Sequence, residues 1–258
     1  MTGVDTIKLF SSDRINGRQI EEVRNIVRKL IGSSIVEASK KELVIQYFID
    51  ESRLDATTLI RRLSVIVSTM LDEALESLVN LDIEIADDVI KREDEANSIY
   101  WLLTRLLLSA ETNSETINKG SVKHSLGFTT CSRLVSKYLE SIADSSKSIA
   151  KIALDLHSFG VVNKKELEQL VYLETLTKEQ FKKSIDSLFA RNVNLANEAI
   201  NQSGKLEVEI ENQLHKSSVP YFRAIAMMLA MISEDSAGIA AMAINTQIYN
   251  SMNALIGS

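Results

Sequence analysis

The sequence contains very little proline, glycine, cysteine or histidine, and each shortage excludes a class of structure. One proline and nine glycines among 258 residues favour long helices over a loop-rich β protein, because few positions force a helix to break. The single cysteine, Cys131, excludes an internal disulfide and fits a reducing cytoplasm. Three histidines scattered without ligand spacing give no sign of a histidine metal cluster.

An excess of positive charge and long apolar runs are also absent from the sequence. The net charge of −6 disfavours non-specific binding to nucleic acid. The most apolar segment, 224–231, is short and is followed by Glu234 and Asp235, so we expect no membrane span. The first residues lack the basic-then-apolar pattern of a signal peptide, so the protein is expected to be cytoplasmic, with at most peripheral membrane contact.

The sequence does contain an internal repeat. Residues 82–90 (DIEIADDVI) are echoed by residues 192–200 (NVNLANEAI), with Ala86 and Ile90 returning as Ala196 and Ile200. The same register extends upstream, where apolar residues of one segment match those of the other: Leu63, Leu71, Leu75, Leu78 and Val79 against Leu173, Phe181, Ile185, Leu188 and Phe189. A register shared across a helix–turn–helix predicts a duplication.

Apolar residues at helical spacing dominate the chain from residue 55 onward. They predict helices over about 56–79, 82–108, 122 or 128 to 156, 164–190, 192–214 and 220–256. Asp82 is a plausible N-cap, and Pro220 suits a first helical turn. The predicted fold is mainly α, a tandem pair of three-helix bundles with domains 54–160 and 161–258.

Residues 1–53 have a different pattern. Alternating residues predict strands at about 6–10, 34–38 and 42–48, and a helix opens at Asn16 or Gly17 and stops at Gly32. This order gives a small α+β unit of β-α-β-β type. It is too small to bury much surface alone, so we expect it to dock on the helices or on a second copy.

The residues that carry candidate chemistry are acidic pairs on the predicted helices. Glu93 and Asn97 stand at i and i+4 on one helix, and Glu140 and Asp144 stand at the same spacing on the next. Neighbouring helices that each present two oxygen ligands can hold a divalent cation or an iron cluster, although such pairs are also common on solvated helix faces. No nucleophile motif or glycine-rich phosphate loop accompanies them.

Two of these stretches resemble a known family. Residues 88–100 (DVIKREDEANSIY) and 137–144 (KYLESIAD), followed by Ile149 and Ala150, are similar to the PhoU family of phosphate-uptake regulators, and the front piece is similar to that of archaeal members. The resemblance spans essentially the whole chain. It implies tandem three-helix bundles and a cytoplasmic, non-enzymatic regulator of phosphate-starvation signalling, associated with a Pst-type ABC phosphate transporter.

The resemblance also implies a metal site in the first bundle. Family members can hold multinuclear metal clusters on acidic motifs, and Glu93, Glu140 and Asp144 match those motifs. Asn97 stands where an aspartate is usual and brings no charge, so cation affinity should fall. The expected cofactor is a divalent metal or an iron cluster held by these residues.

The second bundle retains fewer of the motif's acids. Aligning Ile239 and Ala240 with Ile149 and Ala150 places Ala230 at the position of Glu140, and Ser203 occupies the position of Glu93. Only Glu207 and Glu234 remain as acidic ligands, so the second site is expected to be empty or very weak.

Three functions fit this picture. The first is an adaptor that presents a helix face to a transporter ATPase subunit or a signalling protein, and that assembles into a homodimer or a higher homo-oligomer. The second is a DNA-associated transcriptional regulator that works with an AbrB-type partner, although no AbrB-like module is expected ahead of the first strand. The third, a metal-dependent enzyme acting on phosphate compounds, lacks a recognisable base or arginine clamp beside the carboxylates.

Overall fold

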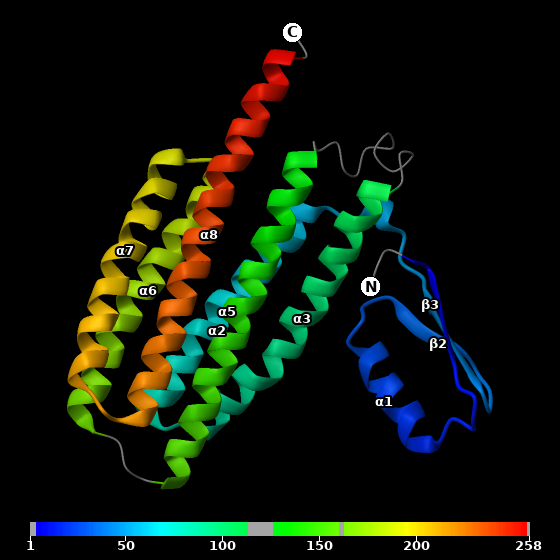
Figure 1. Ribbon diagram of the computed structural model, residues 1–258, viewed down its shortest axis with the longest axis horizontal. Coiled ribbons are helices and arrows are strands. Elements are labelled where there is room, and N and C mark those ends of the chain that lie inside the picture. The colour runs from blue at the N-terminus through cyan, green and yellow to red at the C-terminus, as the bar shows by residue number, and fades with distance from the viewer. Residues whose placement is uncertain (1–3, 113–125, 160–162, 257–258) are drawn as a thin grey trace.

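The computed structural model describes residues 4–112, 126–159 and 163–256, which form a small sheet with one helix and a body of long helices (Figure 1). The mainly α prediction with a β-α-β-β front unit is confirmed. Helix termini fall within a few residues of the predicted ones. The described elements are β1 (Thr6–Phe10), α1 (Gly17–Arg28), β2 (Ser33–Ala38), β3 (Glu42–Tyr47), the short 3-10 helix η1 (Glu51–Arg53), α2 (Ala56–Asn80), α3 (Ile83–Thr112), α5 (Leu126–Phe159), α6 (Lys164–Ala190), α7 (Val193–Lys216) and α8 (Pro220–Ile256).

The N-terminal unit, residues 4–54, is an antiparallel sheet of order β1-β3-β2 with α1 beside it. The central strand contributes most of the unit's buried core, through Leu43, Val44 and Ile45. Asn16 caps α1 in a reciprocal capping box with Gln19. Both outer strands leave one edge without a partner strand among the described residues, which is the feature that makes pairing with another chain conceivable.

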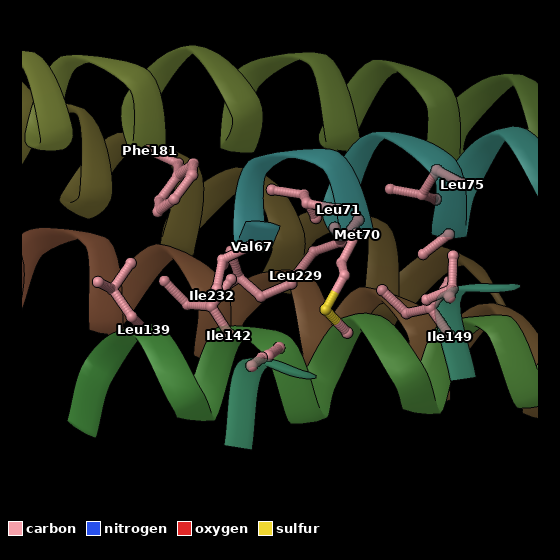
Figure 2. Close-up of a cluster of buried hydrophobic side chains, with 14 of the residues drawn as sticks. Val67, Met70, Leu71, Leu75, Leu139, Ile142, Ile149, Phe181, Leu229 and Ile232 are labelled. Atoms are coloured by element: carbon pink, nitrogen blue, oxygen red, sulfur yellow. The ribbon is translucent and has the colours of Figure 1, made fainter. Parts of the chain in front are cut away.

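The long helices form two groups of three. Helices α2, α3 and α5 contact one another, as do α6, α7 and α8, and the groups meet where α5 packs on α8 and α2 on α6. One hydrophobic cluster runs through both groups, and Figure 2 shows its side chains converging from α2, α5, α6 and α8. The core is therefore continuous across the predicted domains. Their boundary at 160/161 lies outside the described residues, and the division stays a prediction.

The internal repeat is visible at the corners between α2 and α3 and between α6 and α7. Leu81 and Arg191 both adopt a left-handed backbone, with φ of 51° and 53°. Asp82 and Asn192 follow them, and each side chain accepts hydrogen bonds from two backbone N–H groups of the first turn of the next helix. The two halves thus use the same residue positions for the same capping geometry.

Close packing of α5 against α8 depends on two glycines. A Cβ atom added to Gly127 would lie 2.5 Å from the Tyr249 ring, and one added to Gly238 would lie 2.6 Å from the Tyr138 ring. The two helices run antiparallel, so each glycine of one helix receives a tyrosine of the other. This seam joins the two halves of the molecule.

Helix α8 is more apolar than the sequence analysis expected. The stretch Pro220–Tyr249 is long and apolar enough to cross a membrane, and an 18-residue window within it has a mean hydropathy of 1.4, with 44% of that window buried. In the structure it packs against α5, α6 and α7, and Phe222, Leu229 and Ile232 are fully buried in the shared core. The buried part of its apolar surface therefore belongs to the core, while Met227 and Met231 remain exposed.

Candidate functional site

The predicted acidic pairs lie on two helices that pack side by side. Helix α3 carries Glu93 and Asn97, and α5 carries Glu140 and Asp144. The apolar stripes of both helices enter the shared core through residues such as Ile99 and Ile142, and this packing turns the acidic residues toward the same α3–α5 boundary. We call Glu93, Asn97, Glu140 and Asp144, together with the lysines described next, the acidic cluster.

Glu93 is the buried member of the acidic cluster, with 5% of its surface exposed. Its two carboxylate oxygens have different partners. The Asn97 amide donates a hydrogen bond to Oε1 at 2.5 Å, and the Lys147 ammonium on α5 lies 2.6 Å from Oε2. Because a carboxylate only accepts, Asn97 must present its N–H₂ group here, so it acts as a donor rather than as the oxygen ligand that the sequence suggested.

Glu140 and Asp144 lie one turn apart on α5. The Lys137 ammonium pairs with Glu140 at 2.5 Å, and this hydrogen bond raises the pKa of Lys137. Burial raises the pKa of Asp144, and the negative charges of Glu140 and Glu93, together with a hydrogen bond to Glu93, raise it further. The three carboxyl groups of the first predicted site are therefore close enough to repel one another.

The cluster brings the predicted residues together, but it also contains ammonium groups that the prediction had omitted. Within residues 4–112, 126–159 and 163–256, no group of three or more His, Cys, Asp or Glu side chains is arranged to hold a metal ion. Lys147 instead occupies one oxygen of the most buried carboxylate. Metal binding by Glu93, Asn97, Glu140 and Asp144 stays a prediction, and on this geometry a lysine competes with it.

The equivalent region of the second half is largely neutral. Glu207 and Glu234 are both exposed. The position of Glu93 is taken by Ser203, whose hydroxyl lies 3.0 Å from that of Ser233, and Ser233 donates to the Gln180 amide oxygen at 2.6 Å. In the second half, hydroxyl and amide groups thus form hydrogen bonds with one another at the place where the first half has charged side chains. The weak second site remains a prediction.

The sequence analysis missed both lysines of the cluster, although a signal was present. Lys137 precedes Glu140 by three residues and Lys147 follows Asp144 by three, so both lie on the same helix face as the acids. What the spacing does not reveal is that Lys147 reaches across to Glu93 on the neighbouring helix.

A second charged group attaches the N-terminal unit to α3. Arg105, only 4% exposed, donates to Glu51 at 2.7 Å, to the Asp5 carboxylate at 2.5 Å and to the Val4 carbonyl at 2.5 Å. Its guanidinium also stacks 3.7 Å from the centre of the Tyr47 ring. We call this set the Arg105 clamp. A single buried arginine thus holds both ends of the N-terminal unit.

The basic residues of α1 are engaged with acids. Arg18 pairs with Glu22 at 3.0 Å, and Arg24 and Arg28 both approach Glu21. Just beyond the helix, Lys29 pairs with Asp94 of α3 at 2.6 Å. These pairs leave α1 without the concentrated positive charge that a phosphate-binding face needs.

A groove runs along the junction of α2 and α6. It encloses about 640 Å³, and its floor includes the buried Leu71 and Phe181. Val65, 61% exposed, stands in its wall. The charged groups that line it are Asp72, Glu179, Asp186, Lys178 and Lys182, and Lys178 is bound to Asp72 at 2.6 Å.

Comparison with known proteins gives a family model and solved structures. Residues 60–153 match the model of the PhoU domain. The crystal structure of PhoU from Pseudomonas aeruginosa is similar with a TM-score of 0.65 at 15% identity, covering 73% of this chain and 93% of that one. The structure of the phosphate transport system regulatory protein PhoU from Streptococcus pneumoniae is similar with a TM-score of 0.60 at 16% identity. That match covers 73% of this chain and 91% of the other. At these identities the likeness establishes the fold. No curated protein matches the chain in sequence.

Proposed function

Because this chain contains a PhoU domain and has the PhoU fold, we propose that it regulates phosphate uptake as an adaptor protein. Its partner in this proposal is the nucleotide-binding subunit of a Pst-type ABC phosphate transporter, which it contacts in the cytoplasm. The PhoU domain over residues 60–153 is the observation that carries the proposal. The acidic cluster contributes no nucleophile or general base in this role, and recognition proceeds through helix faces.

The α2–α6 groove is the surface that we assign to this partner. Its apolar floor fits the apolar face of a helix. Its lining has three acids and two lysines, and because Asp72 and Lys178 pair with each other, two acids and one lysine remain to contact a partner. The occupant that complements this charge is an amphipathic helix flanked by basic residues. The groove also bridges the two halves, so its width would follow any movement between them.

The test is capture of the purified transporter ATPase subunit by the immobilised protein, at high and at low phosphate. Val65→Glu places a charge in the groove, whereas Val208→Glu changes a valine of similar exposure on α7, 58% against 61%. We expect wild type and Val208→Glu to retain the subunit and Val65→Glu to lose at least about tenfold in affinity. If all three proteins retained the ATPase subunit equally, the groove would not be the docking face. If the wild-type protein did not retain it, the adaptor proposal would be refuted.

The DNA-associated alternative is not favoured by the structure of α1, whose arginines are paired with glutamates of the same helix. A gel shift by the protein alone at low salt tests it. Self-association through the sheet edges or helix faces, and the phosphate dependence of any complex, remain proposals that the same purified proteins can address by light scattering.

A further inference from the structure

The buried carboxylate of Glu93 needs a positive partner, and the structure shows which one it has. A carboxylate that is 5% exposed is costly unless it is paired and hydrogen-bonded. Both oxygens are satisfied from within the chain, one by Lys147 and the other by Asn97. We propose that Lys147 is the cluster's own cation, so that this chain holds Glu93 with an ammonium group where a PhoU-type site would use a metal ion.

The ion pairs that the two lysines form support this assignment. Four acids, namely Glu93, Glu140, Asp144 and Asp235 of α8, lie with two lysines, one bound to Glu93 and one to Glu140. A divalent cation entering between α3 and α5 would have to displace Lys147 from Glu93 and would meet its positive charge nearby. The Lys147 side chain is only 26% exposed, so moving it into water also requires a change in packing.

The internal repeat gives independent support. In the register that pairs Ile149 with Ile239, the position of Lys147 is occupied by Ala237, and Ser203 stands at the position of Glu93. The second half has therefore lost the acid and the lysine together. If the acid served only as a metal ligand, the lysine would not have to disappear together with it. An ion pair does require both residues to be kept or lost together, because either partner left alone would be a buried unpaired charge.

The same joint loss occurs at the other pair. Glu140 and Lys137 of α5 correspond to Ala230 and Met227 of α8.

In the second half, the position that corresponds to Glu93 is occupied by Ser203, which forms a neutral hydrogen bond with Ser233. At the positions of Glu93 and Lys147 the first half has an ion pair, and the second half has the neutral residues Ser203 and Ala237.

The test is a titration of the chelator-treated full-length protein with Mn²⁺, reading free Mn²⁺ by electron paramagnetic resonance. Lys147→Met keeps the length of the side chain and removes the ammonium group. Lys151→Met is the matched control, since Lys151 lies one turn further along α5 and is exposed. We expect wild type and Lys151→Met to show no tight site, and Lys147→Met to gain at least roughly tenfold in affinity for one Mn²⁺ per chain.

Thermal unfolding provides a second readout. Without metal, Lys147→Met should lower the midpoint by roughly 5–10 °C, because it leaves Glu93 buried and unpaired, and Mn²⁺ should restore part of this loss. The double variant Glu93→Ser with Lys147→Ala copies the neutral pair of the second half. We expect it to recover most of the midpoint and to bind no Mn²⁺.

Stoichiometric, tight Mn²⁺ binding by wild type would overturn the proposal. So would a double variant that is no more stable than Lys147→Met. If Lys147→Met fails to fold, the wild-type titration and the double variant still decide the question. None of these results depends on a transporter partner, so the proposed adaptor function can fail while this inference stands.

Discussion

Few charged side chains are buried in the described residues, and each has a defined partner. Glu93 has Lys147, Arg105 has Glu51, Glu174 has Lys178, and Glu166 accepts hydrogen bonds from Ser217 and Tyr221. A buried charge with one specific partner constrains the geometry of both elements that carry it. Such residues are therefore where single substitutions should have the clearest effects.

Removing the guanidinium of Arg105 should loosen the N-terminal unit. Arg105→Met leaves Glu51, which is largely buried, without its cation, at a cost of about 3 kcal/mol. We expect faster amide hydrogen exchange in β1 and β3, with α6 and α7 unchanged. The control is Arg53→Met, because the Arg53 side chain is 85% exposed and pairs with Asp50 rather than with Glu51. Unchanged exchange in β1 would show that the Arg105 clamp does not hold the unit.

Glu174 should give the stability a pH dependence of unusual sign. Burial raises the pKa of this carboxyl, so the native state holds its proton more tightly than the unfolded chain does. Its stabilising contribution is then present at low pH and is lost as the pH rises through the raised pKa. Glu174→Gln mimics the protonated form and should flatten this part of the profile of unfolding midpoint against pH. Glu179→Gln, at an exposed position nearby, should leave the profile unchanged, and an identical profile for Glu174→Gln would contradict the assignment.

At the scale of the helices, the termini are set by local chemistry and the packing by distant residues. Caps at Asp55, Asp82 and Asn192 lie within a few residues of the turns that they stabilise. Sequence patterns therefore predicted the ends of the long helices to within a few residues. The seam between α5 and α8 depends instead on small residues that receive a tyrosine from another helix.

Two glycines in helices should respond in opposite ways to the same substitution. Gly238→Ala should destabilise the protein by about 1–3 kcal/mol, since its Cβ would meet the Tyr138 ring at 2.6 Å. Gly204→Ala in α7 should stabilise it by roughly 0.5–1 kcal/mol, because alanine favours the helix and no neighbouring atom of the described residues lies within 4 Å of the added Cβ. Urea unfolding of both variants measures the difference. A neutral Gly238→Ala would mean that the Tyr138 ring, or the two helices, can move to accommodate the added methyl group at no cost.

The parts of the structure that the sequence did not predict share one physical feature, a long separation along the chain. Arg105 and Asp5 stand 100 residues apart, and Lys147 and Glu93 stand 54 apart. A periodic pattern shows which face of a helix is apolar, but it does not identify the charge that the opposite helix brings to that face. The acids of the candidate site were therefore found, and their lysine partners were not.

At the scale of the whole molecule, buried apolar area is distributed very unevenly. One hydrophobic cluster joins α2, α3 and α5 to α6, α7 and α8. The N-terminal unit has only a few buried apolar residues of its own, namely Ile15, Val27, Leu43, Val44 and Ile45. Since burial of apolar surface is the main stabilising term, the helical body should be far more stable than the unit attached to it.

We therefore predict two unfolding steps that do not coincide with the repeat. As urea increases, amides of β1, β2 and β3 should lose protection from hydrogen exchange first, followed by α2 to α8 together in one cooperative step. The shared core across α5 and α8 is the reason, because neither group of three helices can open without exposing it. Mass spectrometry of exchange across a urea series resolves these steps. Separate loss of α6, α7 and α8 from α2, α3 and α5 would instead support two independent domains divided at 160/161, and would mean that the α5–α8 seam contributes little to stability.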